Sequence, residues 1–181
     1  TTGQAALLIN GTTLHSWAGV QKGDEPYETL LGYVNTNYRA KKRWRETDVL
    51  IIDEVSMLHP GLFNALDKIG KSIRRNEKPF GGIQIILTGD FLQLPPVKSE
   101  KFIFETNLWV DIMKHTIYLT ENMRQNDKDF QDMLSEVRLG ICSDKTKDML
   151  EKCTLNYKIA NGIKNIDATI LGIKPTILYS T

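Results

Sequence analysis

The chain has 181 residues, of which 41% are hydrophobic and 25% are charged. These ordinary globular values exclude a disordered, collagen-like or coiled-coil protein, and the net charge of +1 favours no class of partner. Two cysteines exclude a disulfide scaffold, and no run approaches the about eighteen apolar residues of a membrane span. We therefore expect an intracellular protein without membrane contact. A nucleus, a mitochondrion, a bacterial cytoplasm and a viral factory are all compatible with the sequence.

The two ends of the sequence indicate a fragment. The chain opens at Thr1 without a starting Met or a signal region, and it stops inside an apolar run at Thr181. We expect a domain over 1–153, an irregular connector over 154–174 that is scattered with Asn and Gly, and the start of a second domain at 175–181. The protein is expected to be truncated at both ends.

Apolar periodicity predicts helices that alternate with buried strands. The predicted helices run from Tyr27 to Arg45, from Pro60 onward, from about Asp127 to before Gly140, and from the capping residue Ser143 onward. The predicted strands are the nearly continuous apolar runs at Val49–Ile52, Ile83–Leu87, Thr116–Leu119 and Thr176–Tyr179. This alternation predicts an α/β fold with a parallel sheet flanked by helices.

Two adjacent carboxylates, Asp53 and Glu54, follow the first predicted strand. Ligands of open α/β sheets bind at this carboxyl edge. In a nucleotide-hydrolysing protein the first carboxylate can help to hold Mg²⁺, and the second can polarise the attacking water. The alternative interpretation is an ordinary solvated turn after a strand.

A second strand ends in Thr88-Gly89-Asp90, and Pro95-Pro96 stiffens the segment that holds Gln93. The Gln93 amide can donate to a phosphate oxygen and accept from water, although a turn with a buried glutamine is the alternative.

Arg124 follows the third predicted strand and carries the guanidinium group, which stabilises phosphoryl charge. The alternative for Arg124 is a surface pair with Glu121.

These segments, taken together and in this order, resemble one family. Asp53–Met57, Gly89–Pro96 and Asn122–Gln125 resemble motifs II, III and IV of Pif1-family superfamily 1B DNA helicases. Thr2–Ala6 with Gly11–Trp17 resembles motif Ia, and the segment from Leu62 to Gly82 resembles the signature of the family. The resemblance implies a RecA-like P-loop NTPase fold.

By this resemblance, Mg²⁺ and ATP are the cofactors, held by Asp53, Glu54, Gln93 and Arg124. Asp53 is expected to bind the metal, Glu54 to activate water, Gln93 to sense the γ-phosphate, and Arg124 to act like an arginine finger. The implied parent is an ATP-hydrolysing helicase that moves 5′-to-3′ on single-stranded DNA as a monomer. It unwinds duplex or G-quadruplex DNA in repair, recombination or telomere maintenance.

The resemblance also implies DNA contacts from motif Ia and from the glycine-rich segment. The candidates are Thr2, Gly3, Thr13, His15, Phe80 and Gly81. Phe80 could stack on a base, or Phe80 and Gly81 could form a plain turn, and His15 could be a core-edge histidine bonded to backbone. A basic cluster of Arg39, Lys41, Lys42, Arg43 and Arg45 either follows a DNA backbone or forms a solvated helix face.

A phosphate-binding loop of the form Gly-x-x-x-x-Gly-Lys-Ser/Thr does not occur in residues 1–181. Gly70-Lys71-Ser72 is rejected, because Ala65 stands where the first glycine is needed and the segment lies inside a predicted helix. We therefore expect this chain alone to be inactive. The alternatives are a RecD-like superfamily 1B helicase and a non-catalytic DNA-binding remnant.

Overall fold

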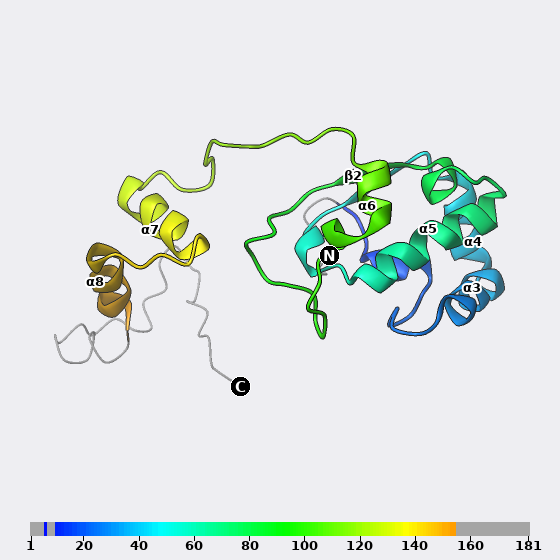
Figure 1. The fold of residues 1–181 in the computed structure, drawn as a ribbon, viewed down its shortest axis with the longest axis horizontal. Helices are drawn as coiled ribbons and strands as arrows, with labels where there is room; N and C mark the ends of the chain where they lie inside the picture. The colour runs from blue at the N-terminus through cyan, green and yellow to red at the C-terminus, as the bar shows by residue number, and fades with distance from the viewer. Residues whose placement is uncertain (1–5, 7–9, 155–181) are drawn as a thin grey trace. The chain divides into compact units, whose positions relative to one another are not determined.

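The computed structural model describes residue 6 and residues 10–154, which divide into two compact units, Thr1–Leu119 and Thr120–Thr181 (Figure 1). The predicted strand at Thr176–Tyr179 and the predicted start of a second domain lie outside the described residues. So does the predicted connector, apart from Thr154. None of the helices in the described part of the chain has the length and apolar character needed to cross a bilayer.

The first unit alternates helices with two short strands. In chain order its elements are α2 (Leu14–Ala18), α3 (Tyr27–Thr36), α4 (Tyr38–Glu46), β1 (Val49–Ile52), the 3₁₀ helix η1 (Val55–Met57), α5 (Pro60–Arg74), η2 (Pro79–Gly82), β2 (Gln84–Leu87), η3 (Ile103–Glu105) and α6 (Asn107–Ile112). Strands β1 and β2 pair in parallel, with Val49 opposite Gln84 and Ile52 opposite Leu87. The predicted parallel pairing of these two runs is confirmed.

Helix α5 forms the centre of the core of this unit. Pro60 begins the helix, and the His59 ring accepts a hydrogen bond from the Gly61 N–H at 3.0 Å. The apolar residues at three- and four-residue steps are all buried, as their spacing predicts: Leu62, Phe63, Leu66, Ile69 and Ile73. Gly70, the rejected phosphate-loop glycine, lies inside α5, as the predicted helix requires.

The predicted helix from Tyr27 to Arg45 is two helices, α3 and α4, that break at Asn37. Asn37 leaves the helical region with φ −95° and ψ 95°, and its side-chain oxygen accepts from the Ala40 N–H at 3.1 Å. This capping bond satisfies an otherwise unpaired donor at the start of α4, which favours a new helix over continuation of the old one.

Helix α4 is held against α2 by Trp44 and Arg43. The fully buried Trp44 donates its indole N–H to the Ala18 carbonyl at 3.0 Å, and its ring lies 4.6 Å from that of Trp17. Arg43 donates to the carbonyls of Trp17 and Ser16, both at 2.8 Å. These long-range bonds fix the orientation of α4 on the unit.

Arg74, near the end of α5, binds the end of α4. Its Nη1 donates to the carbonyls of Trp44, Arg45 and Thr47 at 2.9–3.0 Å, and its Nε donates to Gly81 at 2.7 Å. A cation at this position satisfies the carbonyls that a helix C-terminus leaves unpaired and also interacts favourably with the helix dipole.

The second unit contains α7 (Lys128–Arg138) and α8 (Asp144–Cys153), both close to their predicted bounds. Asp127 caps α7, and Ser143 caps α8 as predicted. An ion pair between Lys145 and Asp129 at 2.6 Å joins the two helices.

The prediction of a strand at Thr116–Leu119 is wrong for this structure. The segment has no strand assignment, and Ile117, Tyr118 and Leu119 are at least 83% exposed. A strand needs a neighbour to accept its ladder hydrogen bonds, and among the described residues only β1 and β2 form a ladder.

Candidate functional site

The carboxyl ends of β1 and β2 bring Asp53 and Thr88 together. Asp53 Oδ1 accepts a hydrogen bond from the Thr88 hydroxyl and another from the Glu54 N–H, the latter at 2.9 Å. The backbone continues the ladder here, because Thr88 donates to Ile52 at 2.9 Å and Val55 donates to Thr88 at 3.1 Å. Both hydrogen bonds fall on Oδ1, so the orientation of the carboxylate is fixed, and among the described residues neither of these two donors engages Oδ2.

Glu54 adopts a strained backbone conformation directly after Asp53. Its φ of 56° and ψ of 49° lie in the left-handed region, and it precedes η1. The backbone therefore turns away from the direction of β1 at Glu54, and the Glu54 side chain is half-buried at the edge of the sheet. Strain of this kind is typical of sites where the surrounding structure holds a side chain for function.

Gly89 closes the edge from the side of β2. Its φ is 151°, and a Cβ at this position would lie 2.9 Å from the Val55 nitrogen, which is too close for a side chain. The glycine therefore lets the backbones after β1 and β2 approach each other. Any other residue at position 89 would crowd this edge, so glycine is required there for a steric reason.

Gln93 lies on the turn that follows Gly89. The Asp90 carboxylate accepts from the Leu92 N–H at 3.1 Å, and the Gln93 N–H donates to the Asp90 carbonyl at 3.0 Å. Phe91 anchors this turn in an aromatic group with Phe102, Phe104 and Trp109, with ring centroids 4.8–5.7 Å from its own. The Gln93 side chain is exposed, not buried as its structural alternative required.

Arg124 belongs to the second unit, where its side chain is exposed. Its backbone N–H donates to the Asn122 side chain at 3.0 Å, so the segment forms a local turn. The structure therefore brings Asp53, Glu54 and Gly89 to one edge and puts Gln93 on the loop that leaves it. The convergence of Arg124 with them stays a prediction.

Two of the predicted DNA contacts lie at the start of α2: Thr13 is its N-cap and His15 is in its first turn. Thr13 caps the helix by accepting from the Ser16 N–H at 3.3 Å. His15 is half-buried and bonds to the Lys22 backbone, and burial lowers the pKa of its imidazole, so the ring is neutral at pH 7. Thr2 and Gly3 lie outside the described residues.

The expectation that Phe80 stacks on a base is wrong for this structure. Phe80 is 0% exposed, its ring lies 5.6 Å from that of Phe63, and its N–H donates to the Asp67 carboxylate at 2.7 Å. Gly81 is also buried, and a Cβ there would lie 2.4 Å from the Gly70 carbonyl oxygen. The segment packs on α5 and holds the core, which is the plain-turn alternative.

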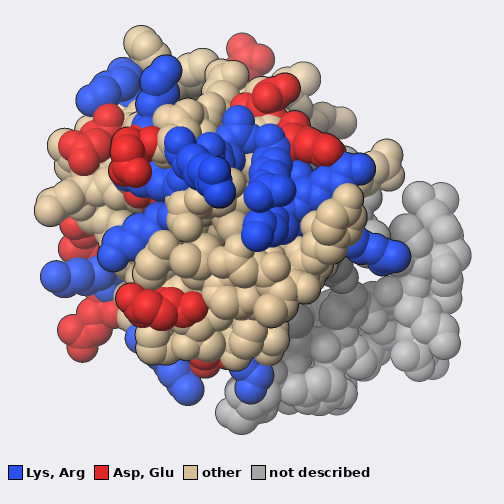
Figure 2. Space-filling model, turned by 90° about the vertical axis from the view of Figure 1, so that its right-hand side faces the viewer, with Lys and Arg blue, Asp and Glu red and all other residues tan. Residues whose placement is uncertain are grey.

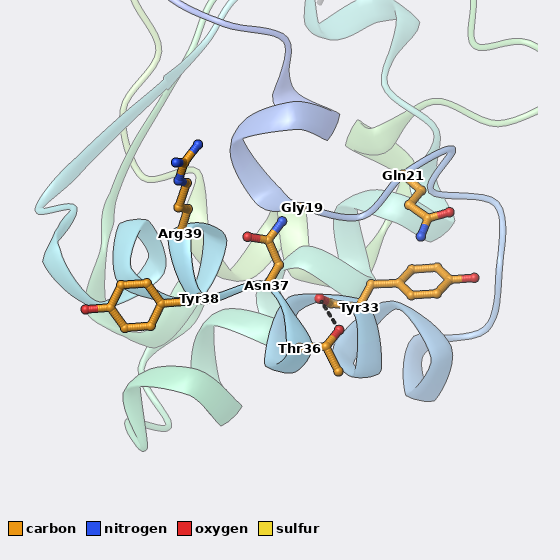
Figure 3. A pocket seen from close by; sticks show the side chains of 7 residues that line it. All are labelled: Gly19, Gln21, Tyr33, Thr36, Asn37, Tyr38 and Arg39. Atoms are coloured by element: carbon orange, nitrogen blue, oxygen red, sulfur yellow. Dashed lines mark hydrogen bonds between the residues drawn. The ribbon is translucent and has the colours of Figure 1, made fainter.

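A shallow hollow of about 550 Å³ lies where the end of α2 meets the junction of α3 and α4 (Figure 3). Arg39 and Gln21 stand on either side of Asn37, while Tyr33 and Tyr38 project in opposite directions.

Two features of the structure were not predicted from the sequence: this hollow, and the role of Thr88 in holding Asp53. The position of Thr88 directly after the second predicted strand was the signal that could have revealed it.

Comparisons with known proteins agree with these features. The model of the PIF1-like helicase family matches residues 1–148. The ATP-dependent DNA helicase PIF1 of Emericella nidulans is 49% identical over 80% of this chain and 20% of the relative. RRM3 of Saccharomyces cerevisiae, also an ATP-dependent DNA helicase, is 40% identical over 99% of this chain and 24% of the relative. The chain thus spans about a fifth to a quarter of the length of these curated relatives.

Solved structures give the same result. The crystal structure of Pif1 helicase from Candida albicans superposes with a TM-score of 0.83 at 42% identity, over 99% of this chain and 39% of that one. The Bacteroides Pif1 helicase in complex with ADP-AlF3 and ssDNA gives a TM-score of 0.70 at 26% identity, over 83% of this chain and 38% of that one. The predicted RecA-like α/β fold is confirmed, and the chain belongs to the PIF1-like helicase family.

Proposed function

We propose that this chain is part of the motor of an ATP-dependent DNA helicase and that the edge of β1 and β2 is its nucleotide site. The observation that carries the proposal is the Asp53 carboxylate, which two donors hold by one oxygen at the carboxyl end of parallel strands. The names of the relatives, which are ATP-dependent DNA helicases, support it.

The residues at this edge fit Mg²⁺ bound to a nucleotide. Magnesium sites commonly use one or two carboxylates, with phosphates and water as the remaining ligands. Asp53 offers Oδ2 for this purpose, and Gly89 is exposed on the neighbouring segment that follows β2. When bound, the metal neutralises phosphate charge.

The remaining side chains divide the chemistry of hydrolysis among them. Glu54 takes a proton from the attacking water, because a carboxylate held at the edge can act as a general base. Gln93, exposed on its turn, donates its amide to an oxygen of the terminal phosphate. Arg124 supplies a guanidinium for the charge that develops on the transferred group.

Single-stranded DNA is the proposed track of the motor, with Thr13 and His15 at the start of α2 and with Thr2 and Gly3 as its contacts. A neutral His15 contributes no charge here, and because its one N–H is bonded to the Lys22 backbone, its other ring nitrogen acts as a hydrogen-bond acceptor. A solved relative is described in complex with ssDNA, which supports this partner. Monomeric 5′-to-3′ movement, unwinding of duplex or G-quadruplex DNA, and roles in repair, recombination or telomere maintenance complete the proposal.

The test compares Glu54→Gln with the wild type in the full-length parent. We expect steady-state ATP turnover to fall by more than about 100-fold, because a general base contributes 10²–10⁴-fold, while single-strand affinity stays within about twofold. A variant that loses single-strand binding or fails to fold contradicts the catalytic role of Glu54. A wild-type parent that binds DNA but hydrolyses no ATP favours the non-catalytic remnant.

Thr88 provides a second test, as a positioning residue. Thr88→Val removes the hydroxyl that holds Asp53 and keeps the shape of the side chain. We expect the Mg²⁺ concentration for half-maximal turnover to rise about tenfold, as for other lost partners of metal ligands, and Thr88→Ser to restore it. A fall in turnover with an unchanged Mg²⁺ requirement contradicts this role.

A further inference from the structure

Helix α4 concentrates positive charge that the chain as a whole lacks. Its nine residues carry five basic side chains and one acidic one, a net charge of +4, whereas all 181 residues sum to +1. The remainder of the chain is therefore net negative, at −3. Figure 2, which views the side of the first unit that carries α3 and α4, shows Lys and Arg gathered across one part of this face.

Two arginines in this region have structural partners and belong to the framework. Arg43 is bound to the carbonyls of Ser16 and Trp17, and Arg74 is bound to the carbonyls at the end of α4. With Trp44 buried beneath, these bonds fix the C-terminal half of the helix. The remaining cations are consequently displayed from a rigid support.

We define the basic face as these remaining cations of α4 together with two in the segment that follows α5: Arg39, Lys41, Lys42, Arg45, Arg75 and Lys78. Within the described residues, an ion pair of this face joins Lys42 to Glu46 at 3.9 Å, with both side chains more than half exposed. Such a pair contributes little. By contrast, Lys71, Lys128, Lys145 and Lys152 each contact an aspartate at 2.5–2.7 Å.

We propose that the basic face binds the phosphate backbone of duplex DNA; this inference rests on the proposed helicase function. Charge complementarity identifies the partner, because duplex DNA carries the densest regular array of negative charge available to such a protein. Nine helical residues span about 13 Å, and each strand of a duplex presents one phosphate per about 3.4 Å of duplex axis, so α4 laid along that axis covers about four phosphates of one strand.

The aromatic residues of this region favour a duplex over a single strand. Sites for single strands interleave cations with exposed rings on which bases stack. Trp44, the ring inside the basic run, is fully buried and cannot stack, and Tyr38 is the one exposed ring on α4. Beside it, the hollow lined by Asn37 and Arg39 offers amide and guanidinium donors that suit phosphate and sugar oxygens (Figure 3).

The test uses the full-length parent with the triple variant Arg39→Gln, Lys42→Gln, Arg45→Gln. Each lost phosphate contact lowers the slope of log affinity against log salt by about 0.9, so the slope for blunt duplex should fall by about 2.7. Duplex affinity at low salt should fall at least tenfold. Single-strand affinity and single-strand-stimulated ATP turnover should stay within twofold.

The matched control is Lys128→Gln, Lys145→Gln, Lys147→Gln, which changes the net charge equally but lies on α7 and α8. It should leave the duplex slope unchanged, and Arg39→Lys with Arg45→Lys should bind duplex as the wild type does. An unchanged slope in the first triple variant refutes the proposal in favour of a solvated face or an acidic protein partner. An equal loss for single strands assigns the face to a single strand and also refutes it.

The two proposals fail in distinguishable ways. If the wild-type parent hydrolyses no ATP, the helicase function fails, while the duplex slopes of the variants still measure the basic face. If ATP turnover responds normally to single strands and the slopes do not differ, the basic face alone is refuted.

Discussion

Arg74 should be among the side chains on which the stability of the first unit depends most. One guanidinium joins three segments: α5, the glycine turn at Gly81 that follows it, and the end of α4, about thirty residues earlier in the sequence. Replacement by Met keeps much of the aliphatic stem and removes every donor. The carbonyls left behind then need water, which reaches the exposed one at Arg45 more easily than the partly buried ones at Trp44 and Thr47.

The expected loss follows from the number and burial of these bonds. A hydrogen bond to a charged group contributes about 1.5–3 kcal/mol, but four such contributions do not add, because Nη1 has two hydrogens for three carbonyls. Because water can also replace part of what is lost, we expect Arg74→Met to cost about 3 kcal/mol. At a urea dependence of about 2 kcal/mol per molar, the midpoint should fall by about 1.5 M.

Tryptophan fluorescence during urea unfolding measures this loss in the right part of the chain, since all three tryptophans lie in the first unit: Trp17, Trp44 and Trp109. The neighbouring Arg75 is the matched control, because it is exposed, and Arg75→Met should change the free energy of unfolding by less than about 0.5 kcal/mol. If both variants unfold at the same urea concentration, Arg74 is not a structural link and the reasoning is refuted.

Three further changes can be followed by the same fluorescence. Gly70→Ala places a Cβ 2.7 Å from the Phe80 carbonyl carbon and oxygen, so overpacking should outweigh the better helix propensity and destabilise by about 1–2 kcal/mol; a stabilised variant would contradict this. Asn37→Ala removes the cap of α4 and should cost about 1 kcal/mol, whereas Asn37→Asp should cost much less. Burial lowers the pKa of His15, so the wild type should lose stability as pH falls below about 6.5, the ordinary value, and His15→Gln should show a smaller loss; equal pH profiles would contradict it.

Local patterns predicted most of the helices. The apolar spacing after Pro60 and the capping residues Asp127 and Ser143 set α5, α7 and α8 through contacts within a few residues. The break at Asn37 was missed because a capping residue inside a charged helical pattern also fits a continuous helix. The strand prediction at Thr116–Leu119 failed because a ladder needs a neighbour that no local pattern supplies.

The candidate site was predictable as far as it depends on parallel pairing. Two apolar runs that pair in register put their polar ends at one edge, which is why Asp53 and Thr88 meet. What the sequence did not reveal depends on contacts between distant residues. Phe80 follows a proline and precedes two glycines, as an exposed turn residue would, yet packing against Phe63 buries it. The partners of Arg74 lie about thirty residues away.

The backbone of Glu54 allows a final prediction that separates function from stability. A residue other than glycine in the left-handed region costs about 1–2 kcal/mol, and glycine avoids most of this cost. Because glycine also gains freedom in the unfolded chain, we expect Glu54→Gly to be more stable than Glu54→Ala by about 1 kcal/mol.

Urea midpoints of these two variants measure the strain without the interactions of the carboxylate, which both variants lack. In the full-length parent neither should hydrolyse ATP at an appreciable rate under the proposed function. If Glu54→Ala were as stable as Glu54→Gly, the left-handed conformation would carry no strain in solution. If Glu54→Gly is the more stable variant, the wild-type backbone at this position is strained, and the fold alone would favour glycine over glutamate. The proposed mechanism gives the reason for glutamate, because the carboxylate acts as a general base at the edge of the sheet.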